Sequence, residues 1–307
     1  MPTANTPYSP PSLDSSAKDN NPLALTPAKV GLLGALAFLL TVTMVRLTIE
    51  CIGGVGIVAY AMSVDPSFDL NNPQMPLGPT ALLTIVMLAT LGVIAVVFAF
   101  MIRPAKQTLG TRMGSLWVYP LAIIGGLTVG ASSGNAGEWL QRIIPEGLQL
   151  GGMDMISEGL RDGPIVSRLL MMLAVSVAAP LFEELVFRGT LWGLLERALP
   201  APVVLIITSV IFAVYHVDPI HVILVFPVGL LIGWVRMTSG SIYPAILLHF
   251  VNNTLAIVLV LTLSDDASIP WYLAFIAATI TVTVAIAAVF GRYRPVAPDL
   301  SVAAKAV

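Results

Sequence analysis

Long apolar runs alternate with short polar connections over most of this sequence. Each run approaches the 20 or so residues that an α-helix needs to cross a bilayer. The runs lie near 30–60, 78–102, 116–133, 166–188, 201–217, 220–237, 241–263 and 270–290. This pattern predicts an all-α fold, a polytopic membrane helix bundle with about eight transmembrane helices.

The composition agrees with this class and excludes others. Of 307 residues, 57% are hydrophobic and only 10% are charged, against about 25% charged in an ordinary soluble domain. The net charge of −2 gives no basic excess for binding nucleic acid. A single cysteine, Cys51, excludes an internal disulfide framework and any site built from several thiolates.

Charged residues in the connections predict the topology. Short cytoplasmic loops of membrane proteins collect Lys and Arg. Basic residues precede the first run and follow the second, fourth, sixth and eighth, whereas the opposite connections are mostly acidic. We therefore expect both termini to be cytoplasmic, in the plasma membrane if the source is prokaryotic. The connection 134–165 is expected to form a short amphipathic element on the outer surface.

Two charges inside the first run stand four residues apart. Arg46 and Glu50 share one face of a helix and can neutralise each other there. We interpret them as a structural ion pair.

The fourth run ends in a cluster of charges. Glu184 and Arg188 are spaced i,i+4 and can form an ion pair, whereas Glu183 is rotated about 100° away and lacks that partner. A carboxylate without a partner in an apolar site suits a general acid or base. The alternative is a helix end where both glutamates reach cytoplasmic water.

The fifth and seventh runs bring three further polar side chains. Phe212 and His216 share a helix face, so the phenyl ring can orient the imidazole, and His249 and Asn253 share another. A carboxamide donor can stabilise an oxyanion beside an imidazole. Alternatively, these residues are polar contacts between helices. His221 lies beyond Pro219 and is interpreted as structural or interfacial.

Together these residues favour hydrolysis by an activated water molecule. Glutamate, two histidines and asparagine can activate water and stabilise a tetrahedral intermediate. The sequence has no His-Glu-x-x-His motif, the usual zinc-protease helix.

The same three motifs resemble the signature of the CPBP family of intramembrane proteases, the CAAX-protease and bacteriocin-processing group, also called Abi. That family shows Glu-Glu-x-x-x-Arg, Phe-x-x-x-His and His-x-x-x-Asn in this order, and the matched region spans about 180–255. The resemblance implies an intramembrane endopeptidase whose substrate is a membrane-anchored peptide or lipopeptide. Eukaryotic relatives remove the tripeptide after a prenylated cysteine at the ER membrane.

Carried over, the resemblance implies a role for each motif residue. Glu183 and His216 would activate water, and His249 and Asn253 would hold the oxyanion. Glu184, Arg188 and Phe212 would give structural support. Glu183, His216 and His249 could instead bind a divalent metal such as zinc, a scheme that competes with glutamate as base. The metal-free glutamate scheme is preferred.

The predicted helix ends leave a mismatch in depth. Glu183 would lie about 8 Å from the cytoplasmic end of its helix and His216 about 22 Å from the same side. They can meet if the fourth helix extends through 189–199, if the fifth is displaced, or if Pro180 kinks the chain.

These interpretations divide the chain into four parts. They are a disordered cytoplasmic tail at 1–28, three helices and an outer loop at 29–165, a catalytic core at 166–264, and a last helix with its tail at 265–307. Two other functions stay open at this point: a proton-coupled transporter, and a noncatalytic bacteriocin-immunity type of membrane protein with the same fold.

Overall fold

The computed structural model describes residues 27–65, 67–68, 76–101, 108–145, 148, 152–263, 270 and 273. In this part of the chain every regular element is helical and none is a strand, which confirms the all-α class. The α-helices are α1 (Pro27–Val64), α2 (Leu77–Met101), α4 (Val118–Ile143), α5 (Gly152–Asp162), α6 (Ile165–Leu173), α7 (Ala179–Glu184), α8 (Trp192–Leu195), α9 (Ala201–Val214), α10 (Pro219–Ser239) and α11 (Tyr243–Thr262).

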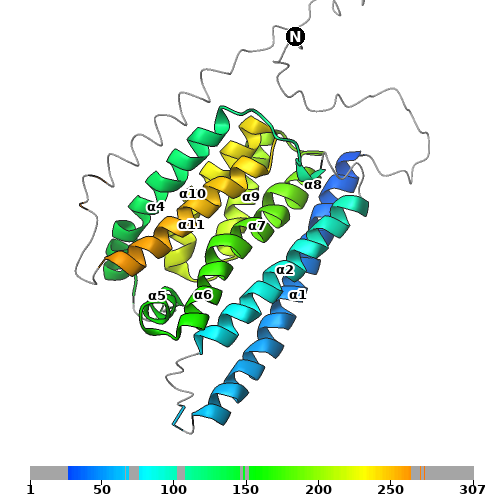
Figure 1. The fold of residues 1–307 in the computed structure, drawn as a ribbon. Coiled ribbons are helices and arrows are strands. Elements are labelled where there is room, and N and C mark those ends of the chain that lie inside the picture. Colours follow the sequence, from blue (N-terminus) through cyan, green and yellow to red (C-terminus); the bar gives the residue numbers. More distant parts are fainter. Residues whose placement is uncertain are drawn as a thin grey trace, which may run out of the picture.

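The long helices run roughly alongside one another as a bundle (Figure 1). Among the described residues, five helical stretches are long and apolar enough to span a membrane: Lys29–Val64, Leu77–Met101, Ile165–Leu195, Pro219–Ser239 and Tyr243–Thr262. Two shorter apolar stretches lie in α4 and α9. These seven correspond to the first seven predicted runs. The eighth, 270–290, lies outside the described helices, as does most of the tail 1–28.

The fourth span is longer than predicted. Instead of ending at Arg188, the helix continues to Leu195 through two π-helical segments, Ala174–Ala178 and Leu185–Leu191, on either side of α7. Glu183 therefore lies twelve residues, about 18 Å, from the end at Leu195. His216 lies about 22 Å beyond the start of α9. The helix extension removes most of the predicted mismatch in depth.

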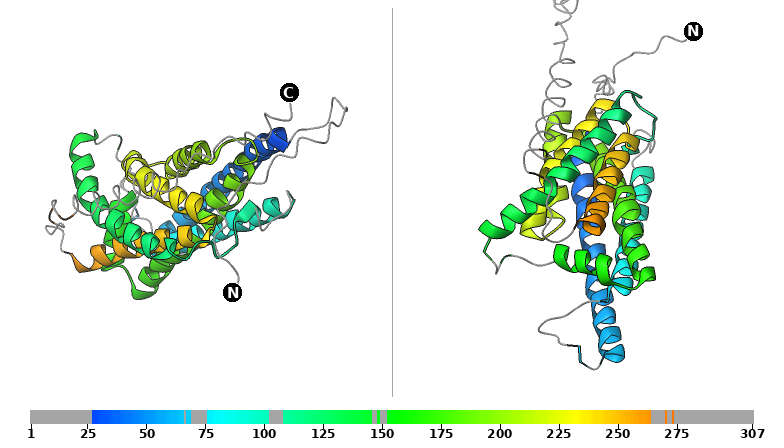
Figure 2. Two further views of the ribbon diagram at one scale, coloured as in Figure 1. Left: turned by 90° about the horizontal axis from the view of Figure 1, so that it is seen from above. Right: turned by 60° about the vertical axis from the view of Figure 1, so that its left-hand side comes forward.

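Two other boundaries also differ from the prediction. α9 ends at Val214 rather than at 217, so His216 lies in the turn that follows the helix. α4 reaches Ile143 instead of ending near 133. The amphipathic element expected within 134–165 is present as α5, which lies across one end of the bundle (Figure 2).

Buried apolar side chains in the described helices form three clusters, of which two are larger. One joins α1, α2, the stretch 185–195 and α9 around Phe38, Trp192 and Phe212. The other joins α4, α10 and α11 around Ile232 and Leu248. Between them lies the buried polar network described below.

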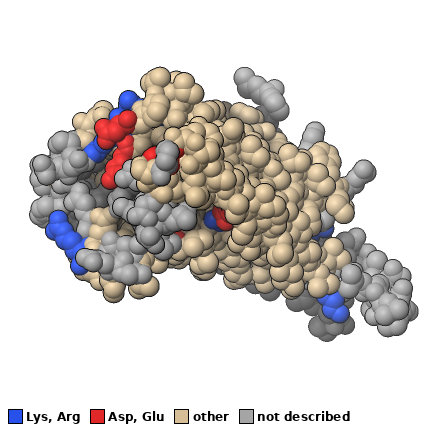
Figure 3. All heavy atoms as spheres, turned by 90° about the horizontal axis from the view of Figure 1, so that it is seen from below, with Lys and Arg blue, Asp and Glu red and all other residues tan. Residues whose placement is uncertain are grey.

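The outward faces are largely apolar. Large hydrophobic side chains such as Leu36, Met44 and Val93 are exposed along the long helices. Seen from below, most of the described surface is neither acidic nor basic, and the acidic side chains lie mainly at the upper left (Figure 3). Exposed apolar faces around buried charges are expected of an integral membrane protein, because lipid rather than water surrounds them.

Candidate active site

The polar network is built on a buried ion pair. The Arg188 guanidinium donates from Nη1 to Glu184 Oε1 at 3.1 Å, and both side chains are fully buried. The i,i+4 pair predicted from the sequence is thus present. Arg188 also donates from Nη2 to the Gly229 carbonyl of α10 at 2.9 Å. The pair therefore ties the 165–195 helix to α10.

Glu184 has a second partner that the sequence did not reveal. Its Oε1 lies 2.9 Å from Nδ1 of His249 on α11. A carboxylate accepts hydrogen bonds, so Nδ1 is the donor and Nε2 of the ring is turned elsewhere. Glu184 was expected only to support the helix together with Arg188. The structure shows that it also orients the His249 imidazole.

Glu183 faces the other nitrogen of the same imidazole. Its Oε2 lies 3.9 Å from His249 Nε2, a separation beyond direct hydrogen bonding. The Glu183 side chain is 18% exposed, whereas its Oε2 atom is buried and has no hydrogen-bond partner among the described residues. The structure thus separates the two glutamates as predicted. It does not support the alternative in which both reach water at a helix end, because Glu184 is fully buried.

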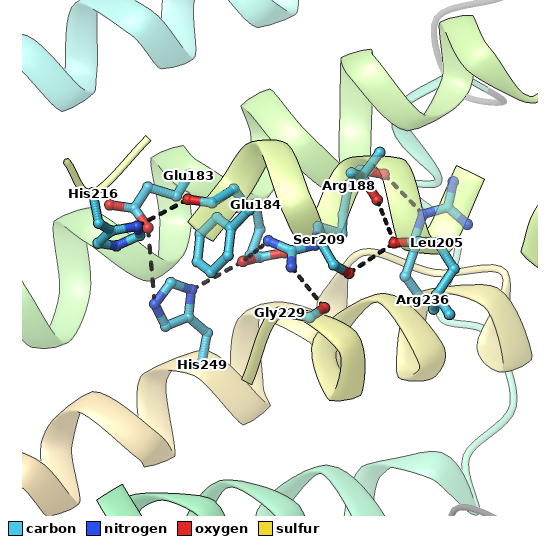
Figure 4. Close-up of polar contacts among 11 residues, drawn as sticks. Glu183, Glu184, Arg188, Leu205, Ser209, His216, Gly229, Arg236 and His249 are labelled. Atoms are coloured by element: carbon cyan, nitrogen blue, oxygen red, sulfur yellow. Dashed lines mark hydrogen bonds and ion pairs between the residues drawn. The ribbon is translucent and has the colours of Figure 1, made fainter. Parts of the chain in front are cut away.

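Phe212 packs against both imidazoles. Its ring centroid lies 5.0 Å from that of His216 and 5.7 Å from that of His249, edge-on in both cases. The Arg188 guanidinium lies 4.2 Å from the centre of the same ring. His216 Nδ1 lies 2.9 Å from the Phe212 carbonyl oxygen, so Nδ1 donates and Nε2 is the acceptor nitrogen of the neutral ring. Figure 4 shows Glu183, His216 and His249 at one end of the network.

Asn253 is anchored rather than free. Its amide nitrogen donates to the Val175 carbonyl at 2.9 Å, and its carbonyl oxygen accepts a hydrogen bond from Asn252 at 3.0 Å. Val175 belongs to the first π-helical segment, so Asn253 links α11 to the helix that carries Glu183. The remaining amide hydrogen of Asn253 is the one that could donate a hydrogen bond to an oxyanion.

The predicted metal-binding residues Glu183, His216 and His249 lie in this network, and their metal-binding role stays a prediction. Within the described part of the chain, no group of three His, Cys, Asp or Glu side chains is placed to hold a metal ion. His249 Nδ1 already faces Glu184, and His249 Nε2 stands 3.9 Å from Glu183 Oε2. Figure 4 shows His216 beside these two residues.

Two residues near the site were not assigned to it from the sequence. The His221 ring lies 4.6 Å from that of His216, although His221 was expected at a boundary. Arg46 contacts the carbonyl oxygen and the ring of Tyr215, the residue before His216. Arg46 also forms the predicted ion pair with Glu50, at 2.7 Å. Both contacts depend on the turn after α9, which apolar periodicity does not specify.

Comparison with known proteins shows what this region is similar to. Residues 165–255, which contain all three motifs, match the family model described as type II CAAX prenyl endopeptidase Rce1-like. The Bacillus subtilis (strain 168) protein named "Putative membrane peptidase YdiL" is 28% identical over 90 residues. Those residues make up 29% of this chain and 37% of that protein, so the chain matches little more than a third of the curated relative's length. No solved structure matches the chain.

The resemblance predicted from the motifs is therefore confirmed over residues 165–255. The stretch that is similar to this family model is the one that carries the buried polar network. It comprises the helix from α6 to α8, together with α9, α10 and the first part of α11.

Proposed function

We propose that the protein is an intramembrane endopeptidase that hydrolyses a peptide bond of a membrane-anchored peptide or lipopeptide. The single observation that carries this proposal is the buried Oε2 of Glu183, which lacks a hydrogen bond and stands 3.9 Å from His249 Nε2. We infer a water molecule that bridges these two atoms from one side, about 2.8 Å from each.

In the proposed reaction Glu183 takes a proton from this water as general base. The oxygen then bonds to the carbonyl carbon of the scissile peptide and gives a tetrahedral intermediate. Collapse of the intermediate breaks the carbon–nitrogen bond, and the proton passes to the leaving amine. The second proton of the water also ends on the amine, so the products are one carboxylate and one protonated amine, and atoms and charge balance without a further reactant.

Two imidazoles and one amide would support these steps in different ways. His216 presents an acceptor at Nε2, which suits it to share the water proton with Glu183. His249 Nε2 would receive from Glu183 the proton taken from the water, and would donate it to the oxyanion in a hydrogen bond while Glu184 faces the other side of the charged ring. The remaining amide hydrogen of Asn253 would be the second donor.

The scheme needs no metal ion, and no step is assigned to one. We also propose that both termini lie on the cytoplasmic side, as the basic connections predict.

The test compares wild-type protein with Glu183→Gln in liposomes that contain a panel of membrane-anchored peptides. We expect wild type to give a defined cleavage product and Glu183→Gln to lose at least about 100-fold in kcat. Glu158→Gln on α5 is the matched control, because it removes a carboxylate outside the site. Equal product from wild type and Glu183→Gln would overturn the proposal. Proton-driven solute uptake that disappears in Glu183→Gln would support a transporter instead.

A further inference from the structure

The turn that carries His216 contains an unusual backbone conformation. Val217 has a φ of 66°, and no other non-glycine residue in the described part of the chain has a positive φ. The Asp218 N–H donates to the His216 carbonyl at 2.7 Å across Val217, as in a γ-turn. For a β-branched residue such a positive φ is sterically unfavourable. Contacts from the surrounding structure must therefore hold this turn in place.

One of these contacts comes from α10. The Asp218 carboxylate accepts hydrogen bonds from the N–H groups of Ile220 and His221, at 2.9 and 3.0 Å. Asp218 thereby caps the first turn of α10 and fixes the end of the turn that follows Val217.

The other contact comes from α1, outside the region that matches the family. Arg46 donates from Nη1 to the Tyr215 carbonyl, and its guanidinium lies 4.4 Å from the centre of the Tyr215 ring. The last carbonyls of a helix lack helical partners, and a cation there also complements the helix dipole. Arg46 thus satisfies the end of α9 one residue before His216.

Glu50 holds Arg46 in this orientation. It accepts from Arg46 Nε at 2.7 Å, which leaves the Nη1 edge directed at Tyr215. The Arg46 side chain is only 17% exposed, so the pair is placed against the bundle.

We infer that Arg46, held by Glu50, is a positioning residue that keeps the strained turn 215–218 in the conformation that presents His216 to Glu183. This inference rests on the proposed function for its effect on catalysis. It adds α1 to the parts of the chain on which the site depends.

The first measurement compares kcat and KM of wild type with those of Arg46→Ala. Displacing a catalytic group by about 1 Å can cost about 100-fold, so we expect about that loss in kcat. KM should change by less than about threefold, because substrate contacts are unaffected. Arg161→Ala is the matched control: Arg161 likewise donates to the end of a helix, at Val260 of α11 and at Leu263 directly after it, away from His216. A loss of kcat in Arg46→Ala no larger than in Arg161→Ala would overturn the inference.

A second substitution tests the role of the strained turn. Glycine adopts a positive φ without steric cost. In the double variant Arg46→Ala/Val217→Gly the turn should keep its shape without the arginine. Its kcat should be at least about tenfold higher than that of Arg46→Ala. A double variant as slow as Arg46→Ala would show that Arg46 does not act through this turn. If Arg46→Ala does not fold, Arg46→Lys serves instead, because lysine cannot bond Glu50 and Tyr215 in the same fork geometry.

A readout without substrate separates this inference from the proposed function. Nitrogen-15 NMR of the histidine rings, assigned with His216→Gln, reports which ring nitrogen of His216 carries the proton. Wild type should show Nδ1 protonated, and Arg46→Ala should show a mixture of tautomers, whereas Arg161→Ala should match wild type. An unchanged His216 signal in Arg46→Ala would contradict the inference even if wild type cleaved every peptide tested. A changed signal would support it even if none were cleaved.

Discussion

At the scale of single residues, Phe212 explains why three charged or ionisable groups occupy defined positions. Its ring is fully buried and touches Arg188 on one side and the imidazoles of His216 and His249 on others. An aromatic ring attracts a cation at its face and polar groups at its edge. One apolar side chain thus contacts two imidazoles and the arginine of the buried ion pair.

The Glu184–Arg188 pair gives a prediction about stability. Arg188→Met would leave Glu184 as a buried charge without its cation, which costs about 3–5 kcal/mol. Thermal unfolding in detergent micelles, followed by circular dichroism, measures the loss. The double variant Glu184→Met/Arg188→Met should be more stable than Arg188→Met, since no unpaired carboxylate remains. A double variant less stable than the single one would show that Glu184 contributes mainly through His249.

At the scale of helices, the approach of α4 to α11 positions His249. A Cβ atom on Gly126 of α4 would lie 2.6 Å from the Leu248 carbonyl oxygen and 2.9 Å from Val251. Small residues at such crossings let helix backbones come close in membranes. Leu248 directly precedes His249, so this crossing also positions the part of α11 that carries His249.

A single methyl group tests this crossing. Gly126→Ala forces α11 away from α4 and should cost about 1–3 kcal/mol in stability, together with a loss of activity. Gly54→Ala on α1 is the control, because nothing lies within 4 Å of its added Cβ and the change should stay within about 1 kcal/mol. Both variants are compared by thermal unfolding and by kcat. Equal effects would mean that the crossing tolerates the methyl group.

The sequence predicted local pairs well because helix geometry alone brings positions i and i+4 together. Arg46 with Glu50, Glu184 with Arg188, and Phe212 with His216 all follow from that spacing. The partners of His249 and Asn253 did not follow, because Glu184 and Val175 reach them from another helix. The π-helical segments were also missed, since apolar runs do not distinguish helix types.

At the scale of the whole molecule, the family resemblance and the buried network occupy the same region, 165–255, with α1, α2 and α4 packed around it. The sequence predicted this core and its membrane location from apolar runs and motif order. It did not predict which outer helix would contact the site. That contact depends on the turn at Val217, whose conformation has no glycine to signal it.

The length of α1 has a consequence for the surroundings in which the protein works. Its 38 residues measure about 56 Å, well beyond the hydrocarbon core of about 30 Å, and its lower end extends past the other helices in Figure 1. Such a helix responds to bilayer thickness by changing its tilt, at fractions of a kcal/mol per Å. Because α1 carries Arg46, a change of tilt moves the guanidinium relative to the end of α9.

We expect kcat in phosphatidylcholine liposomes to vary about fivefold from myristoleoyl to erucoyl chains in wild type and to stay nearly constant in Arg46→Ala. Equal lipid dependence in both proteins would contradict this link. If only wild type responds to chain length, membrane thickness is one of the variables that set the rate of the proposed hydrolysis.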